Sequence, residues 1–554
     1  MSRKRPVLRF LASATAAVMF LSAGSQGPAR LDAGGQGFAA SAGLGPQVSA
    51  DARHDISPPL RSMPFRPPSQ KPDREVPLRV PPRVRGKRTA IDPVAQTQPG
   101  ALATPSVSNS FEGLSDADNA AVLGYRVVPP DTNGDVGPKD YVQVVNILLA
   151  VYDKTTGVRR FGPKPINTLW SGFGGICETH NDGDPIILHD QLADRWIVSQ
   201  LAVGTDGHQC IAVSTTTDPT DSYYRYDFLV SPGGTNDYPK FGLWPDAYYM
   251  TANQFNGGFQ GAIAVAFQRE PMLSGASAQM VKFGPLPCAV ECFFSLQPSH
   301  LAGTSPPVGT PNTFIMAFDD QTWGTGLNAD GYRLWNFSVK WLTPASSTFT
   351  PLGQVNAPGF DSNLCNYSRQ CIPQPKPGER LDSLSQFTMY RAQYRWFGSY
   401  AALVVNHTVD VNGQDRAGIR WAELRNSGSG WSLNQNQTGT YSPDSKHRWA
   451  GSIAMDKNGN IALGYSVSSS TVAPSIRYTT RTASDLPGQM GTEAILRSGQ
   501  GVQYRSYNRW GDYSTMSIDP SDDCTFWYTQ EYYANSGSFN FKTRFGSFKM
   551  PDCR

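Results

Sequence analysis

A short motif occurs three times in the C-terminal half of this chain of 554 residues. Each copy begins with Arg-Trp, reaches a serine within a few residues and runs on into an apolar-rich segment. The copies begin at Arg395, Arg448 and Arg509, so they start 53 and 61 residues apart. Self-similarity at such a period, with strand-forming composition, is typical of a β-propeller in which each repeat forms one blade. The motif therefore predicts an all-β fold in which equivalent residues of different blades converge around one axis.

Strand-like segments alternate with Gly, Asn and Asp turns from Phe111 to the C-terminus. Seven blades of uneven length fit these segments best, and six or eight fit almost as well. A pair of β-sandwiches is the alternative, but it accounts less well for the repeats. The composition of 53 Gly, 11% aromatic and only 17% charged residues also favours short strands joined by tight turns. The net charge of +3 is too small to indicate a nucleic-acid partner.

The N-terminus has the pattern of an export signal. Arg3, Lys4 and Arg5 precede an apolar stretch that is too short to span a bilayer and is followed by small residues. Pro-Pro pairs and clustered arginines then predict a disordered spacer without a core of its own. We expect a signal peptide over 1–24, the spacer over 25–110 and the propeller over 111–554. The mature protein would be a secreted monomer, extracellular or periplasmic, without a membrane span.

All eight cysteines lie within the predicted propeller. An even number of cysteines in an exported chain favours disulfides, although eight cysteines allow 105 pairings. Pairing of nearest neighbours along the chain is the simplest choice. It predicts the bridges Cys177–Cys210, Cys288–Cys292, Cys365–Cys371 and Cys524–Cys553. The last bridge would tie the final strand, within 538–549, to the strand that follows Cys524.

Several phrases of the chain resemble a family of large exported bacterial proteins without assigned function. They are residues 130–138 (PDTNGDVGP), residues 181–185 with 193–196, and the segment from Arg448 to Ser466. A more distant resemblance is to sialidase-type propellers, whose turns carry Ser-x-Asp-x-Gly-x-x-Trp boxes and whose sites use three arginines. Residues 454–459 and 517–520 approximate such boxes, whereas the Arg-Ile-Pro segment of sialidases is absent. The second resemblance implies a propeller that binds or cleaves acidic glycans.

Asp131, Asn133 and Asp135 alternate in the sequence Asp-Thr-Asn-Gly-Asp. Oxygen donors at every second position can wrap a hard cation, and the glycines allow a sharp turn. One hypothesis is therefore a structural Ca²⁺ site on this loop. The alternative is a tight turn held by hydrogen bonds of the Asp and Asn side chains. No motif indicates a nucleotide cofactor.

Polar residues crowd one short segment beside Cys177. Polar density of this kind at the mouth of a propeller is typical of a binding site, and a network internal to the loop is the alternative. A histidine with acidic neighbours also suits a metal, but no second histidine follows at a ligand spacing. We predict a ligand-binding role for Glu178, His180, Asp182 and Asp184.

The repeated arginines have two interpretations. Each arginine either covers a tryptophan between blades and pairs with a nearby carboxylate, or it joins the others in a central cationic pocket. In the second case, planar guanidinium groups would bind a carboxylate or sulfate with two hydrogen bonds each. We predict Arg395, Arg448 and Arg509 as ligand-binding residues, with Asp382, Asp512 and Glu423 as candidate acid or base groups if the protein is an enzyme.

Three hypotheses on function remain at this point. The first is an exported propeller that binds an extracellular glycan or another cell-surface polymer. The second is a glycan-cleaving enzyme that acts on an acidic sugar, which needs two carboxylates near the arginines. The third is a passive extracellular scaffold or adhesin. The fold by itself does not choose among them.

Overall fold

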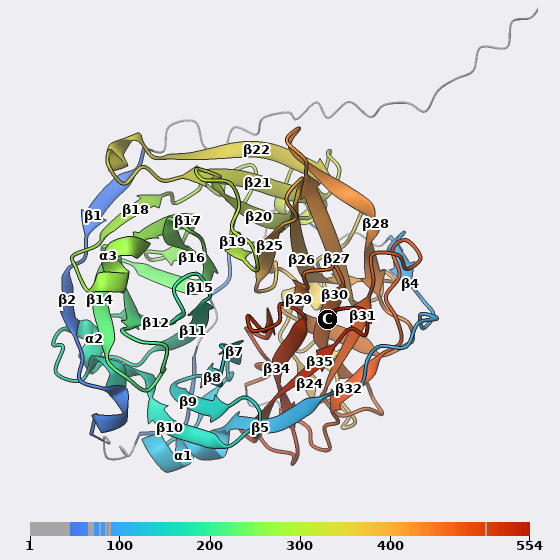
Figure 1. Cartoon of the computed structure of the whole chain (residues 1–554). Helices are drawn as coiled ribbons and strands as arrows, with labels where there is room; N and C mark the ends of the chain where they lie inside the picture. Colours follow the sequence, from blue (N-terminus) through green and yellow to red (C-terminus); the bar gives the residue numbers. More distant parts are fainter. Residues whose placement is uncertain (1–44, 65–70, 77–78, 83–85, 87–89, 505–506) are drawn as a thin grey trace, which may run out of the picture. The chain divides into compact units, whose positions relative to one another are not determined.

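The computed structural model describes the chain except for residues 1–44, 65–70, 77–78, 83–85, 87–89 and 505–506. The predicted signal peptide lies outside the described residues. Strands dominate the rest, as the sequence predicts (Figure 1). The helices in the described part are short: α1 (Asp116–Leu123), α2 (Ile176–Thr179), α3 (Arg269–Ser274) and α4 (Asp320–Trp323). No described helix is long and apolar enough to cross a membrane.

Antiparallel groups of four main strands follow one another along the chain. The first three groups are β7 (Asn133–Val136), β8 (Asp140–Val145), β9 (Leu148–Asp153) and β10 (Arg159–Pro165); β11 (Gly183–Asp190), β12 (Arg195–Val203), β13 (Gly207–Ser214) and β14 (Tyr223–Ser231); and β15 (Thr235–Leu243), β16 (Ala247–Phe255), β17 (Phe259–Gln268) and β18 (Gln279–Phe283).

The next two groups and β4 (Ala95–Gln96) form one nine-stranded sheet, in which a parallel pairing of β19 with β25 joins the two groups. They are β19 (Gln297–Leu301), β20 (Asn312–Phe318), β21 (Gly331–Ser338) and β22 (Thr348–Asn356); and β25 (Ala392–Trp396), β26 (Ala401–Asp410), β27 (Ala417–Asn426) and β28 (Trp431–Tyr441). A separate two-stranded ladder, β23 (Ile372–Pro373) with β24 (Arg380–Leu381), lies between them in sequence.

The C-terminal groups complete the fold. One is β29 (His447–Met455), β30 (Ile461–Ser468), β31 (Ser475–Arg481) and β32 (Ala494–Arg497). The other combines β33 (Thr515–Ile518), β34 (Thr525–Tyr533) and β35 (Phe541–Lys549) with β5 (Asn109–Ser115) from the start of the chain. Divided at the β19–β25 pair, the described strands make seven groups, which we use as blades below and name by their first strands. The blade count of the protein stays a prediction.

The blades form a closed cycle, which Figure 1 shows with the first strands toward the middle. Each first strand contacts the next, in the order β7, β11, β15, β19, β25, β29, β33 and again β7. A blade therefore has a neighbour on both of its faces. For this reason β11 and β26 are buried along their whole lengths, and their sequences do not alternate as those of half-exposed strands do.

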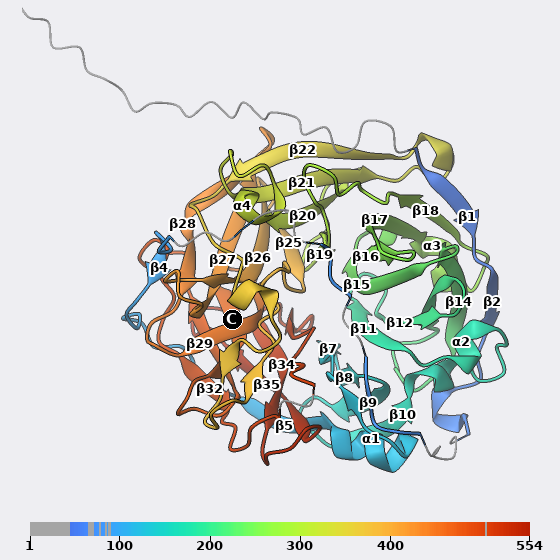
Figure 2. The same ribbon diagram turned by 180° about the vertical axis from the view of Figure 1, so that it is seen from behind.

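Residues before 111 add strands to the outer edges of the blades, which differs from the predicted disordered spacer. β1 (Gln47–Ala50) pairs with β18, β2 (Arg53–Ile56) with β14, and β4 (Ala95–Gln96) with β28. Figures 1 and 2 both show β1, β2 and β4 at the periphery. These strands are held by main-chain hydrogen bonds to open sheet edges. Their own side chains are largely exposed, so the sequence has no apolar pattern that indicates them.

The predicted closure of the last blade is confirmed. β35 pairs with β34 along its length, and β5 pairs with the far side of β35. All four predicted disulfides form: Cys177–Cys210, Cys288–Cys292, Cys365–Cys371 and Cys524–Cys553. Disulfides of this kind are typical of proteins that fold in an oxidising compartment.

Candidate functional site

The chain turns sharply where it enters several first strands, and these turns meet near the axis. Asp131, Asp184, Tyr238 and Asp512 have positive φ angles of 47°, 49°, 59° and 61°. Such angles are uncommon outside glycine and are more frequent for Asp. The Tyr238 hydroxyl donates to the Asp512 carbonyl at 2.9 Å, and the Tyr513 hydroxyl donates to the Asp184 carboxylate at 3.2 Å. The β7, β11, β15 and β33 blades therefore join at one place.

We call the charged residues at this place the axial cluster, and all of its members are buried. The cluster contains four carboxylates and two basic side chains: Asp131, Asp184, Asp237, Asp512, Lys240 and Arg509. Two of these residues also join blades: the Asp512 carbonyl accepts from Tyr238, and the Asp184 carboxylate accepts from Tyr513. Burial of this many ionisable groups is rare unless they are paired.

Lys240 lies at the middle of the axial cluster. Its Nζ is 3.1 Å from the ring centroid of Tyr238 and 3.3 Å from that of Tyr513. No described residue accepts a hydrogen bond from this ammonium group. Burial lowers the pKa of Lys240 well below its usual range, while Asp184, Asp131 and Asp512 act in the opposite direction. Two aromatic faces thus replace the usual carboxylate contact of a buried lysine.

Three carboxylates of the cluster, Asp131, Asp184 and Asp237, hold their protons more tightly than usual. Burial raises the pKa of Asp184 to about 6, although Lys240 favours its ionised form. Burial and the neighbouring Asp184 raise the pKa of Asp237 to about 8. Burial, with Asp512 and Asp184 nearby, also raises the pKa of Asp131 well above its usual value. Neither carboxylate oxygen of Asp131 meets hydrogen-bond geometry with a described residue.

Arg509 joins the cluster to residues around it. Its guanidinium binds both carboxylate oxygens of Asp512, and its Nη1 lies 3.5 Å from Asp382. Burial raises the pKa of Asp382 to about 6, although Arg509 favours the charged form. Arg509 also contacts Glu75, with 3.3 Å between its Nε and the carboxylate. One of the three repeated arginines therefore lies beside two of the candidate acid or base groups.

The other two repeated arginines have separate partners and do not join Arg509. Arg395 forms a bidentate ion pair with Asp523, at 2.7 and 2.6 Å. Arg448 binds Asp444 and Glu493, each at 2.8 Å. Both guanidinium groups are buried. The interpretation in which each arginine pairs with a nearby carboxylate describes these two, and a central pocket of three arginines does not form.

The predicted calcium loop binds β11 through one oxygen each of Asn133 and Asp135. Asn133 accepts a hydrogen bond from the Ile187 amide at 3.1 Å, and Asp135 accepts one from the His189 amide at 3.0 Å. Asp135 also pairs with Arg391 at 3.1 Å. Among the described residues, no group of three or more acidic, histidine or cysteine side chains is arranged to hold a metal ion. Calcium binding stays a prediction, which melting in chelator and in calcium would test.

Three of the four predicted binding residues near Cys177 form other contacts, within their loop or with the end of β12. Glu178 accepts from the amides of Gly172 and Gly174. His180 contacts Thr179, and Asp182 accepts from the Val203 amide at 2.8 Å. Only Asp184 reaches the axial cluster. Glu423, the remaining candidate acid or base, lies on β27 and pairs with Arg425.

Sequence reasoning missed Asp237, Tyr238, Lys240 and Tyr513. A signal for part of this set was present, because Asp184-Pro185 and Tyr238-Pro239 are equivalent dipeptides 54 residues apart. These dipeptides place Asp184 and Tyr238 at one repeat position, and in the structure Asp131 shares their positive φ. Lys240 gives no such signal, since a lysine in a strand normally indicates an exposed position.

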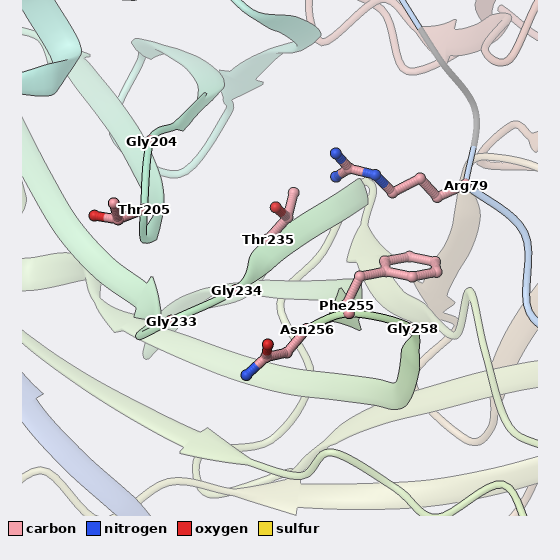
Figure 3. Close-up of a pocket in the computed structure, with 10 residues that line it drawn as sticks. Arg79, Gly204, Thr205, Gly233, Gly234, Thr235, Phe255, Asn256 and Gly258 are labelled. Carbon is pink, nitrogen blue, oxygen red and sulfur yellow. The ribbon is translucent and has the colours of Figure 1, made fainter.

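A surface cavity of about 380 Å³ opens beside the cluster, between turns of the β11 and β15 blades (Figure 3). Three glycine-containing turns line it, together with polar side chains and one aromatic ring: Arg79, Gly204, Thr205, Gly233, Gly234, Thr235, Phe255, Asn256, Gly257 and Gly258. Gly233 and Gly257 both have φ of 66°, a conformation that favours glycine. The Arg79 amide donates to Asp237 at 3.1 Å, so this cavity adjoins the axial cluster.

Comparison with known proteins gives no family for this chain. No family model and no curated protein matches it. Solved structures with similarity include an endo-arabinase from Bacteroides thetaiotaomicron (12% identity, TM-score 0.27, covering 53% of this chain and 92% of that one). Others are an ulvan lyase from a new polysaccharide lyase family (11%, 0.35, 79% and 96%) and an α-L-arabinanase from Penicillium chrysogenum (10%, 0.32, 69% and 99%). TM-scores of 0.27 to 0.35 assign no chemistry to this chain.

Proposed function

We propose that this protein is an exported β-propeller that binds a polysaccharide at the cavity between the β11 and β15 blades. The observation that carries the proposal is the lining of this cavity (Figure 3). Its volume of about 380 Å³ lies within the range of small-molecule sites. A sugar unit needs hydrogen-bonding groups around its edge and an apolar surface for one face.

The lining supplies both kinds of contact. Thr205, Thr235 and Asn256 offer hydroxyl and amide groups, and the glycine turns expose main-chain groups without side chains in front of them. The Phe255 ring faces the side of the cavity that Arg79 closes (Figure 3), and an aromatic face suits the apolar face of a sugar. Arg79 adds a positive charge that favours an acidic polysaccharide.

Retention on immobilised polysaccharides tests this proposal. The unaltered protein is expected to be retained by at least one neutral or acidic polysaccharide. Phe255→Ala and Asn256→Ala should each weaken retention by tenfold or more. Val308→Ala, at a fully exposed valine that does not line the cavity, is the matched control and should change nothing. If no polysaccharide retains the unaltered protein, the passive scaffold replaces this proposal.

Cleavage of a glycan is a second candidate function, because the Asp237 carboxylate accepts a hydrogen bond from the amide of Arg79, which lines the cavity. A general acid must be protonated near the working pH, and burial can raise the pKa of a carboxyl group to that range. Asp184, with a pKa of about 6, and Asp237, with a pKa of about 8, meet this condition. Release of reducing ends from the retained polysaccharide would be the measurement. Asp184→Asn should abolish that release without loss of retention, and absence of release by the unaltered protein would exclude cleavage.

A further inference from the structure

A short N-terminal segment crosses the axial cluster and contacts four blades. We call its described residues, 73–76 and Arg79, the strap. β3 (Arg74–Glu75) pairs in parallel with β6 (Val127–Val128), and Arg74 donates to the Asn181 carbonyl at 2.8 Å. The Arg79 amide donates a hydrogen bond to the carboxylate of Asp237 in the β15 blade. Arg509, which precedes β33, donates to the Val76 carbonyl at 3.4 Å.

Glu75 of the strap lies between two arginines. Its Oε1 atom forms ion pairs with both Arg509 and Arg369. The Arg509 side chain is fully buried, whereas the side chain of Glu75 is 21% exposed. The Arg369 side chain is 37% exposed, so solvent reaches this place beside Arg369 and Glu75, and one carboxylate from the chain itself occupies it.

The fit of this carboxylate is incomplete. The Nε of Arg509 is buried and makes no hydrogen bond with a described residue, although Glu75 is only 3.3 Å away. The other two nitrogens of this guanidinium already bind Asp512. A carboxylate that is free to orient can bind the remaining edge of Arg509 with better geometry, because arginine favours planar, directed contacts.

We propose that Arg369 and Arg509 form a binding site for the carboxylate of a uronic acid, and that Glu75 occupies this site as an internal ligand. The inference rests on the proposed polysaccharide binding and names its substrate class, an acidic polysaccharide. A uronic acid unit of the polysaccharide takes the place of Glu75. The strap competes with the ligand and so lowers the apparent affinity of the intact protein.

Substitution of Glu75 tests the competition directly. Galacturonate oligomers are titrated by calorimetry into the unaltered protein, Glu75→Ala and Glu75→Gln. Both variants should bind the oligomers at least tenfold more tightly than the unaltered protein. Glu112→Ala is the matched control, because it also removes a partly exposed carboxylate that pairs with an arginine, Arg544, and it should leave the affinity unchanged. Equal affinity in all four proteins would overturn the proposal.

Two further measurements keep the result specific. Adding Arg369→Gln to Glu75→Ala should remove the gain in affinity, and a gain that persists would overturn the site. Sodium acetate should raise the melting temperature of Glu75→Ala more than sodium chloride at equal ionic strength, since a free carboxylate refills the position. This second readout needs no polysaccharide. If melting shows the carboxylate effect while no polysaccharide is retained, the proposed function fails and the anion site stands.

A sulfated polysaccharide tests whether the site prefers a carboxylate or a sulfate group. Dextran sulfate and polygalacturonate are compared with Glu75→Ala in the same buffer. The proposal expects stronger binding of the carboxylated polymer, because the site holds a carboxylate in the intact protein. Stronger binding of the sulfated polymer would overturn the assignment to uronic acids.

Discussion

The axis and the rim of this propeller are built by opposite means. At the axis, buried side chains of distant blades meet, and charged groups such as Asp184 and Lys240 lie in the protein interior. At the rim, β1 and β2 add to the blades through main-chain hydrogen bonds, and their side chains remain mostly exposed. The axis therefore depends on which residues are present, whereas the rim depends mainly on backbone geometry.

This difference indicates where function and stability reside. A buried cluster of unlike charges is sensitive to the loss of any one member, and it can tune the pKa of the others. Main-chain pairing at an edge tolerates most substitutions, because every residue except proline supplies the same groups. We therefore expect substitutions at the axis to depend on pH and substitutions at the rim to be independent of it.

The largest effect is expected from Lys240→Met. Loss of the ammonium group removes its contacts with the Tyr238 and Tyr513 rings, each worth about 2 kcal/mol when desolvated, and leaves Arg509 as the remaining basic side chain of the axial cluster. The loss should be greater at pH 8 than at pH 5, where Asp184 and Asp237 are mostly protonated. Urea unfolding at the two pH values measures it. Lys282→Met is the control, since Lys282 is buried but donates to the Val230 carbonyl at 2.7 Å; equal pH dependence of both variants would contradict the prediction.

The bridge of the closing blade should come next. Cys524–Cys553 closes a segment with a sequence separation of 29, for which the chain-entropy model gives about 3–4 kcal/mol. Cys553→Ser should lower the free energy of unfolding by this amount without changing ligand binding. Cys288→Ser removes a bridge with a separation of only 4 and should cost less, about 2 kcal/mol. A greater loss in Cys288→Ser than in Cys553→Ser would contradict this order.

At the rim, one apolar anchor should matter more than the strands around it. Leu60 follows β2 and is buried in the core between the β7 and β11 blades. Leu60→Ala should cost about 2–3 kcal/mol because it leaves a cavity. Ile56 of β2 is 59% exposed, so Ile56→Ala is the matched control with little effect. Thermal unfolding of both variants measures the difference, which should be the same at pH 5 and pH 8.

The smallest expected effect concerns the pH dependence of Asp184→Asn. Because the folded pKa of about 6 lies above the usual 3.8, ionisation destabilises the fold as pH rises from about 4 through 6. The variant should gain about 2 kcal/mol relative to the unaltered protein over this range, because the folded and unfolded pKa values are about two units apart and each unit corresponds to about 1.4 kcal/mol. Unfolding curves at pH 4, 5, 6 and 7 measure it.

Asp153→Asn is the control with the opposite sign. Hydrogen bonds from Thr156 lower the pKa of Asp153, so its contribution to stability is present above the unfolded pKa and is lost as the pH falls through the folded pKa. This variant should lose stability relative to the unaltered protein as the pH rises. The same pH trend in both variants would show that the burial of Asp184 is not the cause.

Much of the architecture could be predicted because it is encoded locally. The repeated Arg-Trp segments indicated blades, and pairing of nearest cysteines gave all four bridges. The rim could not be predicted, since Val48 and Ile56 are exposed and show no buried face. The composition around the Pro-Pro pairs correctly indicates a segment without its own core, but it carries no information on pairing with a distant sheet edge.

The axial cluster likewise contains some residues that the sequence indicated and others that it did not. Asp131, Asp184, Arg509 and Asp512 were each singled out from sequence, but for three different roles: metal ligand, ligand contact and acid or base. Their meeting depends on closure of the ring, which brings the β7 and β33 blades into contact. Lys240 was missed because nothing in its strand distinguishes a buried lysine from an exposed one.

The sequence by itself determined the all-β repeat, the disulfide pairs and the identity of most charged residues at the axis, because each follows from neighbours in the chain. Only the tertiary structure decided that Arg395 and Arg448 bind carboxylates of their own surroundings while Arg509 contacts Glu75. Equivalent positions in a repeat share a backbone path, but their partners range from Asp444, four residues from Arg448, to Glu75 of the distant strap, which contacts Arg509. Those partners, and therefore the charge and pKa values at the axis, are fixed only when the blades close around it.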